Sequence, residues 1–116
     1  MMLDVFLVMA TVISTSHLCP SMCDCTAQGR VDCSQRELTQ VPPGIPPSTR
    51  YLDLRGNLLE VLPRYSLSGL GENLVHLDLS KNNLRNIDPN AFRGLKKLRT
   101  LYASQSVMNG SLSLLT

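Results

Sequence analysis

Residues 51–70 read YLDLRGNLLEVLPRYSLSGL, and residues 76–95 read HLDLSKNNLRNIDPNAFRGL. Apolar residues and one asparagine recur in the two segments with a constant offset. The matched pairs are Leu52 with Leu77, Leu54 with Leu79, Asn57 with Asn82, Leu59 with Leu84, Leu62 with Ile87, Leu67 with Phe92 and Leu70 with Leu95. A repeat of this period predicts a solenoid, because one unit cannot bury its own apolar edge and must stack on a copy of itself.

Each unit begins with a short strand. Leu52 and Leu54 alternate with polar residues, as do Leu77 and Leu79 in the second unit. This alternation predicts strands with one buried face. Stacking would place the strands side by side in a parallel sheet, with the later leucines of each unit packed behind it. We therefore expect two full repeats, at residues 49–72 and 73–97.

Asn57 and Asn82 hold the same place in the two units, shortly after the last strand leucine. A buried amide is costly unless it is hydrogen-bonded, but its two donors and its acceptor could satisfy backbone groups where the strand ends. The alternative is that both asparagines occupy exposed turns, where Asn is common. Their constant distance from the leucines favours the buried, structural role.

The pattern L-x-L-x-x-N-x-L-x-x-L-x-x-x-x-F-x-x-L resembles that of extracellular leucine-rich repeat proteins, over about Cys19 to Leu101. Members of that family are curved solenoids. The resemblance implies an α/β solenoid, namely a short arc with a parallel sheet on its concave face and a disulfide-linked cap at its N-terminal end. A third repeat begins with Leu98 and Leu101.

This third repeat, at residues 98–116, is predicted to be incomplete. Ala103 stands where a leucine is expected, and Ser106 stands where the asparagine is expected. Loss of a buried leucine side chain typically costs about 2–5 kcal/mol, so we expect the chain to be frayed from Ala103 onward. The only N-x-S/T sequon begins at Asn109 in this segment, and glycosylation there would require solvent access.

The N-terminal end has the features of a secretory signal. Residues 5–13 form an apolar run, followed by small residues at Ser14 and Ser16. This run is too short to cross a bilayer, which takes about 20 residues, and it fits a signal peptide at residues 1–16. Asp4 and the absence of Lys and Arg before the run depart from that pattern, and a buried strand is the alternative. We expect a secreted or extracellular protein, at the cell surface if a longer form carries a membrane segment.

Four cysteines follow, at Cys19, Cys23, Cys25 and Cys33. Four cysteines allow three pairings, and the spacing does not choose among them. A zinc site is the alternative, but the C-x2-C pairs usual for zinc are absent and a secreted protein passes through an oxidising compartment. The resemblance implies a cysteine-rich cap at residues 17–48 with bridges Cys19–Cys25 and Cys23–Cys33. No metal or cofactor is expected.

Leu38 and Val41 precede Leu59 and Leu62 by one common spacing, slightly shorter than that of the two full repeats. A shortened repeat is therefore expected to run through the proline-rich end of the cap.

The charge pattern says little about partners. The net charge of +2 does not indicate nucleic-acid binding. One basic cluster comprises Arg93, Lys96, Lys97 and Arg99. It could meet a sulfated glycan or an acidic partner, but charge runs more often form solvated faces.

Enzymatic chemistry has one weak candidate. Asp53 and Asp78 hold equivalent places between strand leucines, so they would lie on neighbouring strands about 4.8 Å apart. Two such carboxylates could serve as acid and base, as in glycoside hydrolysis. The alternative is a solvated acidic column flanked by Arg50 and Arg55. Because no phosphate loop, nucleophile elbow or metal-spaced His/Glu pair accompanies them, we expect no enzyme.

The concave face is the predicted binding surface. Residues between and just after the strand leucines should project from it, and the predicted ligand-binding residues are Tyr51, Asp53, Arg55, His76 and Asp78. Aromatic, acidic and basic groups on a rigid sheet suit protein recognition. The resemblance likewise implies binding of an extracellular protein ligand, as part of a receptor ectodomain or a secreted matrix protein.

The chain stops at Thr116 without a second cysteine cap or a membrane span. Members of the family normally carry such a closing cap, so we expect a fragment or a truncated form of a longer precursor. The alternative function is therefore a truncated isoform without independent binding activity, or one that acts as a decoy.

Overall fold

The structure is a computed structural model, and it describes residues 19–104. The predicted signal peptide, the predicted glycosylation site at Asn109 and the predicted frayed segment beyond Ser104 lie outside these residues.

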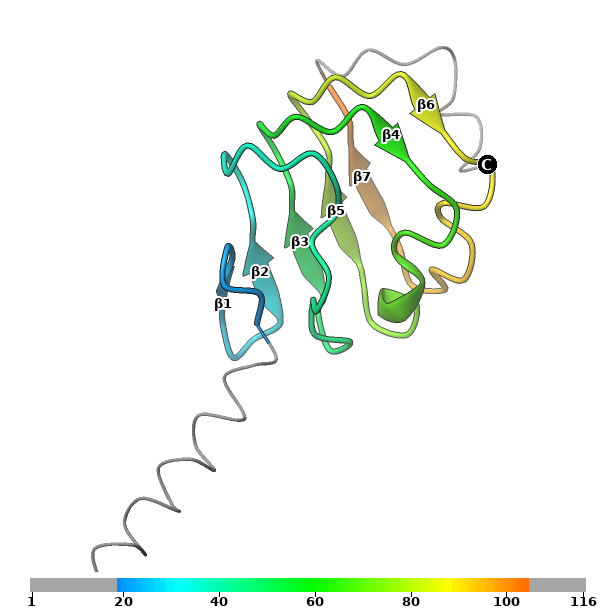
Figure 1. The fold of residues 1–116 in the computed structure, drawn as a ribbon. Helices are drawn as coiled ribbons and strands as arrows, with labels where there is room; N and C mark the ends of the chain where they lie inside the picture. The colour runs from blue at the N-terminus through cyan, green and yellow to red at the C-terminus, as the bar shows by residue number, and fades with distance from the viewer. Residues whose placement is uncertain (1–18, 105–116) are drawn as a thin grey trace, which may run out of the picture.

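The larger sheet has five strands in the order β1-β2-β3-β5-β7 (Figure 1). They are β1 (Asp24–Cys25), β2 (Arg30–Asp32), β3 (Tyr51–Asp53), β5 (His76–Asp78) and β7 (Thr100–Tyr102). β1 is antiparallel to β2, and all other neighbours are parallel. Leu52 lies opposite Leu77, and Leu77 lies opposite Leu101. Each repeat therefore contributes one strand, in the register that the leucine pattern predicts.

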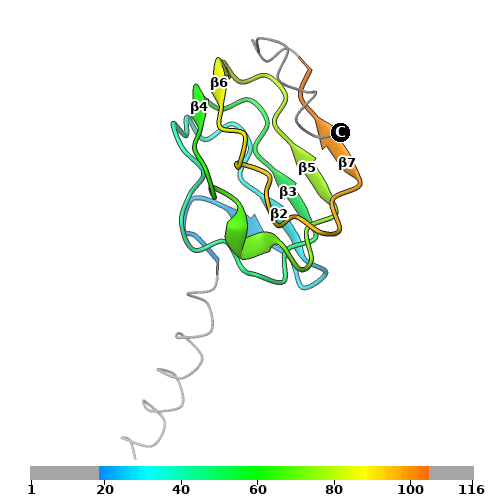
Figure 2. The ribbon, with the colours of Figure 1, turned by 90° about the vertical axis from the view of Figure 1, so that its right-hand side faces the viewer.

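The returning limbs lie across the core from this sheet (Figure 2). β4 (Val61–Leu62) and β6 (Asn86–Ile87) pair in parallel, and a short 3-10 helix, η1, spans Ser68–Leu70. The expected solenoid with a parallel sheet and a linked cap is confirmed, but residues 19–104 contain no α-helix. Pro63 and Pro89 interrupt the limbs, and since proline lacks an N–H group it cannot continue a helix.

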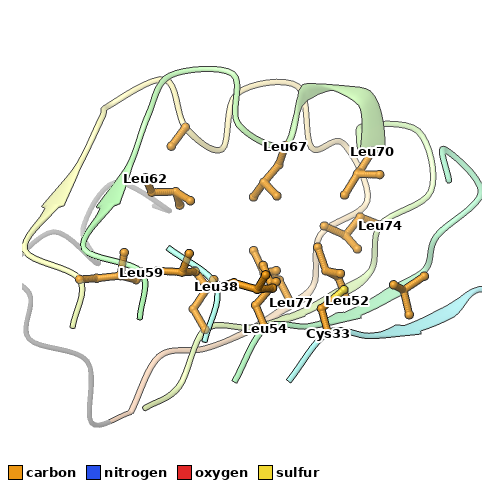
Figure 3. Close-up of a cluster of buried hydrophobic side chains, with 14 of the residues drawn as sticks. Cys33, Leu38, Leu52, Leu54, Leu59, Leu62, Leu67, Leu70, Leu74 and Leu77 are labelled. Atoms are coloured by element: carbon orange, nitrogen blue, oxygen red, sulfur yellow. The ribbon is translucent and has the colours of Figure 1, made fainter. Parts of the chain in front are cut away.

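The core fills the space between the sheet and the limbs (Figure 3). Buried leucines from both sides meet there, among them Leu52, Leu54, Leu59, Leu62, Leu67, Leu70, Leu77, Leu79 and Leu84. Thr49 and Leu74 form a further buried pair, with the same offset as the leucine pairs. The repeating leucines of the sequence therefore form the hydrophobic core. Each repeat adds one further buried residue, Thr49 or Leu74, ahead of its strand.

The third repeat forms its strand. The N–H of Leu79 donates to the C=O of Tyr102 at 2.7 Å, and that of Lys81 donates to the C=O of Ser104 at 2.9 Å. Leu101 is only partly buried, because no further repeat packs on it within the described chain. Up to Ser104 the segment follows the sheet, despite Ala103 in place of a leucine.

Two disulfides hold the cap, and they are the pairs that the resemblance implies: Cys19–Cys25 and Cys23–Cys33. Cys33 is fully buried, and its N–H donates to the C=O of Asp53 at 2.8 Å. Since β2 of the cap pairs in parallel with β3 of the first repeat, the cap occupies the edge of the sheet that the first repeat would otherwise expose.

Asn57 and Asn82 are both buried, as the repeat predicts. The Oδ1 atom of Asn57 accepts the N–H of Leu38 at 3.0 Å, and its Nδ2 donates to the C=O of Cys33 at 2.9 Å. These bonds tie the first repeat to the cap. The amide thus satisfies backbone groups that the turn after the strand leaves without a partner.

Asn82 repeats this arrangement one unit further along. Its Oδ1 accepts the N–H of Leu59 at 3.0 Å, and its Nδ2 donates to the C=O groups of Leu54 and Leu79, each at 3.0 Å. The side chain therefore bonds the first repeat to the second. A column of buried asparagines connects neighbouring units in addition to the sheet itself.

Asn82→Ala should lower the free energy of unfolding by about 1–3 kcal/mol, because it leaves buried N–H and C=O groups unpaired. Asn86→Ala is the matched control, since Asn86 is exposed on β6 and should be nearly neutral. Urea denaturation of both variants measures the difference. Equal losses would contradict the linking role of Asn82.

Candidate binding face

The concave face is the side of the larger sheet that points away from the leucine core. Its side chains alternate with the buried Val31, Leu52 and Leu77 and with the partly buried Leu101. The strand register arranges them in two rows across β2, β3, β5 and β7. The first row is Arg30, Tyr51, His76 and Thr100, and the second row is Asp32, Asp53, Asp78 and Tyr102.

Three neighbouring side chains of the first row contact one another. The rings of Tyr51 and His76 have their centroids 5.7 Å apart with an interplanar angle of 41°. The guanidinium carbon of Arg30 lies 4.0 Å from the centroid of the Tyr51 ring. Arg30 and both rings are at least partly exposed. The structure thus brings two of the predicted ligand-binding residues together and places Arg30 beside them.

The second row is built differently from what the sequence suggests. Asp53 and Asp78 are only 3% and 8% exposed, so they do not form a solvated acidic column. The Oδ1 atom of Asp53 accepts the N–H of Arg55 at 3.0 Å, and that of Asp78 accepts the N–H of Ser80 at 2.9 Å. These carboxylates hold the ends of the strands and offer little surface to a ligand.

Arg55 is exposed beside this row. Its guanidinium lies 3.5 Å from the Oδ2 atom of Asp53. Tyr102, at the far end of the row, is 50% exposed. The accessible part of the concave face therefore consists mainly of aromatic and basic side chains, whereas the carboxylates of Asp53 and Asp78 are buried.

Asp32 continues the second row into the cap. Its Oδ1 atom accepts both the hydroxyl and the N–H of Ser34, at 2.6 and 2.9 Å. These hydrogen bonds hold the pKa of the Asp32 carboxyl below its ordinary value of 3.8. Because the pKa is lowered in the folded state, the charged carboxyl stabilises the fold above pH 3.8, and this contribution is lost as the pH falls below that value.

Asp32→Asn keeps an acceptor for Ser34 but removes the charge. At about pH 6 the variant should unfold at a lower urea concentration than the wild type, and the two midpoints should approach each other as the pH falls below 3.8. Comparison of the two proteins cancels the titration of the other carboxyls. A difference that stays constant with pH would contradict the role of this charge.

Arg30 and Asp32 were not among the predicted site residues. A signal for them exists, because Val31-Asp32-Cys33 precedes Leu52-Asp53-Leu54 by the same offset that relates Leu38 to Leu59. The strand of the cap has the same length as the repeat strands and pairs with β3 over all three residues, so its outward residues extend the concave face.

The predicted basic cluster lies elsewhere, on the chain between the second returning limb and β7 (Figure 1). The Nζ atom of Lys96 lies 2.9 Å from the Oε2 atom of Glu72, with both side chains exposed. Arg93 donates to the Oδ1 atom of Asn90 at 3.4 Å. Lys97 and Arg99 are exposed. None of these four basic residues belongs to either row.

The described part of the chain offers neither a metal cluster nor a membrane helix. Residues 19–104 contain no group of three or more His, Cys, Asp and Glu residues that could hold a metal ion. Over the same range, no helix has the length and apolar character that a membrane crossing requires.

Comparisons with known proteins agree with the architecture. Residues 47–107, more than half of the chain, match the family model described as leucine rich repeat, and residues 19–46 match the leucine rich repeat N-terminal domain. The chain is 40% identical over 89 residues to chondroadherin-like protein of Homo sapiens, across 76% of this chain and 12% of that protein. It is 36% identical over 99 residues to leucine-rich repeat-containing protein 3 of Danio rerio, across 82% of this chain and 37% of that protein.

A solved structure shares the fold. The crystal structure of human 5T4 (Wnt-activated inhibitory factor 1, trophoblast glycoprotein) has a TM-score of 0.73 and 38% sequence identity, and the match covers 78% of this chain and 34% of that one. This chain thus spans well under half the length of these relatives. Both the cap and the repeats match, and the chain therefore belongs to the leucine-rich repeat family.

Proposed function

We propose that this protein is an extracellular interaction module that binds a protein partner through its concave face. The observation that carries the proposal is the row of Arg30, Tyr51 and His76, which is accessible to solvent and held on paired strands. Tyrosine and arginine are enriched among the residues that dominate binding energy at protein interfaces. A rigid sheet presents them with little conformational entropy to lose on binding.

The location outside the cell rests on the cap. Two disulfides form and persist in oxidising compartments, and the chain shares its cap with the leucine rich repeat N-terminal domain. We propose that the protein is secreted or displayed at the cell surface. Among the similar proteins, leucine-rich repeat-containing G-protein coupled receptor 5A of Xenopus laevis is 40% identical over 93 residues, across 78% of this chain and 10% of that receptor.

The predicted binding residues take different roles under this proposal. Tyr51, His76 and Arg55 would contact the partner directly. Asp53 and Asp78 would act indirectly, because their carboxylates are buried and bind the N–H groups that follow each strand. Substitution of these two residues would therefore change stability as well as binding.

The secreted full chain, assembled into tetramers for avidity, should bind a partner in an array of extracellular protein domains. Tyr51→Ala and His76→Ala should each weaken that binding by about 1 kcal/mol or more, that is about fivefold or more, while the melting temperature changes little. Val61→Ala is the matched control, since Val61 is exposed on β4 across the core. A partner that is insensitive to both concave variants but sensitive to Val61→Ala would contradict the proposal.

A further inference from the structure

The guanidinium of Arg30 has no anionic partner within residues 19–104. Four ion pairs occur there, and Arg30 takes part in none of them. The nearest carboxylate in sequence, that of Asp32, is bound by Ser34. The hydrogen bonds from Ser34 are also the largest cause of the lowered pKa of Asp32, and the charge of Arg30 is the smallest cause. Arg30 is therefore an exposed cation next to a row of aromatic rings.

The position of Arg30 is fixed by its surroundings. Its backbone N–H donates to the Oγ1 atom of Thr26 at 3.2 Å. The C=O of the preceding Gly29 accepts the N–H groups of Arg50 and Tyr51, at 2.7 and 3.1 Å. Gly29 has a φ of +84°, and a Cβ atom there would lie 3.0 Å from the C=O of Ser48. Only glycine allows the cap to approach the first repeat this closely, and this approach places Arg30 beside Tyr51.

Stacking on Tyr51 also limits how the guanidinium can bind. The group is planar, with its N–H donors directed outward in its own plane. Its central carbon lies over the Tyr51 ring at 4.0 Å from the centroid, and the guanidinium takes part in none of the four ion pairs of residues 19–104, so the N–H groups at its edge are available to a ligand. A carboxylate fits such an edge through two parallel hydrogen bonds, which are shorter and stronger than neutral ones. Fixing the group beforehand reduces the entropy lost on binding.

We propose that the partner of the concave face presents an acidic side chain, a Glu or Asp carboxylate, to Arg30, with an apolar or aromatic neighbour against Tyr51 and His76. This inference rests on the proposed function, because it names the chemistry of the partner at the same face. It also makes the disulfide-linked cap part of the binding surface, since β2 supplies Arg30. An acidic segment of an extracellular protein is the kind of partner that this row fits.

A peptide titration followed by NMR tests the inference directly. The probe is acetyl-Glu-Tyr-Glu-amide, and the matched control is acetyl-Gln-Tyr-Gln-amide. The Nε–H resonance of Arg30 should shift in a saturable way with the acidic peptide, and the control should bind about tenfold more weakly. Arg64 is an internal reference. Its guanidinium carbon lies 5.1 Å from the centroid of the Tyr65 ring, on the returning limb and not on the concave face, so it should show no saturable shift.

Arg30→Lys and Arg30→Gln complete the test. Lysine keeps the charge but loses the paired hydrogen bonds, so binding of the acidic peptide should fall severalfold. Glutamine should reduce it to the level of the control peptide. Because the side chain of Arg30 is not part of the core, both variants should keep the wild-type melting temperature. If either variant fails to fold, the wild-type titration decides the result.

Three results would overturn the inference. One is an equal response of Arg64 and Arg30, which would indicate non-specific anion binding. Another is tighter binding of inorganic sulfate than of the acidic peptide, which would favour a sulfated glycan. The third is a protein partner that is weakened by Tyr51→Ala but unaffected by Arg30→Gln, in which case the proposed function stands and the acidic contact does not. A partner that is unaffected by either substitution would contradict both the proposed function and the acidic contact.

Discussion

Leu77→Ala should lower the free energy of unfolding by about 2–5 kcal/mol. Leu77 is fully buried on β5, and its register partners are Leu52 on one side and Leu101 on the other. The substitution would leave a cavity at the centre of the stack, which neighbouring backbones held in a sheet cannot close. Since domains of this size are stable by about 5–15 kcal/mol, the loss is a large fraction of the total.

Leu101→Ala is the matched control, with the same change at the same place in the next repeat. Leu101 is only partly buried, so less apolar surface is removed and the cost should be about half or less. Urea unfolding followed by circular dichroism measures both variants. Equal losses would show that Leu101 is packed as tightly as Leu77, which would contradict the graded burial along the solenoid.

Removal of the Cys23–Cys33 bridge should cost about 3 kcal/mol, and removal of Cys19–Cys25 about 2 kcal/mol. The two bridges close loops with sequence separations of 10 and 6 residues, and the longer loop gains more entropy when it is opened. Cys23 and Cys33 are also buried in the core, whereas Cys19 and Cys25 only pack against it. The bridge to Cys33 should therefore matter more.

The double variants Cys23→Ala with Cys33→Ala, and Cys19→Ala with Cys25→Ala, test this order. Thermal unfolding should show the larger drop in melting temperature for the first pair. The asparagine column gives a second readout, because Asn57 donates to the C=O of Cys33, and protection of nearby amides from hydrogen exchange should fall with it. A larger effect of the Cys19–Cys25 pair would contradict the account of the cap.

Much of the fold was predictable because the residues that form the strands and the core recur at the same positions in two repeats. The leucine spacing predicted the parallel strands and their register, and the constant position of Asn57 and Asn82 predicted that both would be buried. The structure confirms these points. Side-chain alternation and repeat period are local properties of the chain, so they can be read without knowing what packs where. Pro63 and Pro89 likewise carry a local signal against a helix in the limbs.

The composition of the concave face depended on the tertiary structure in two respects. The sequence places Asp53 and Asp78 on the outward side of their strands, but only the folded chain shows them covered and bound to the N–H groups of Arg55 and Ser80. Arg30 joins Tyr51 only because β2 pairs with β3, a strand distant from it in the chain. The sequence by itself determined which side of each strand a residue occupies, because alternation is local. Its exposure and its neighbours were decided by the tertiary structure, because they come from chain segments that are far apart in the sequence.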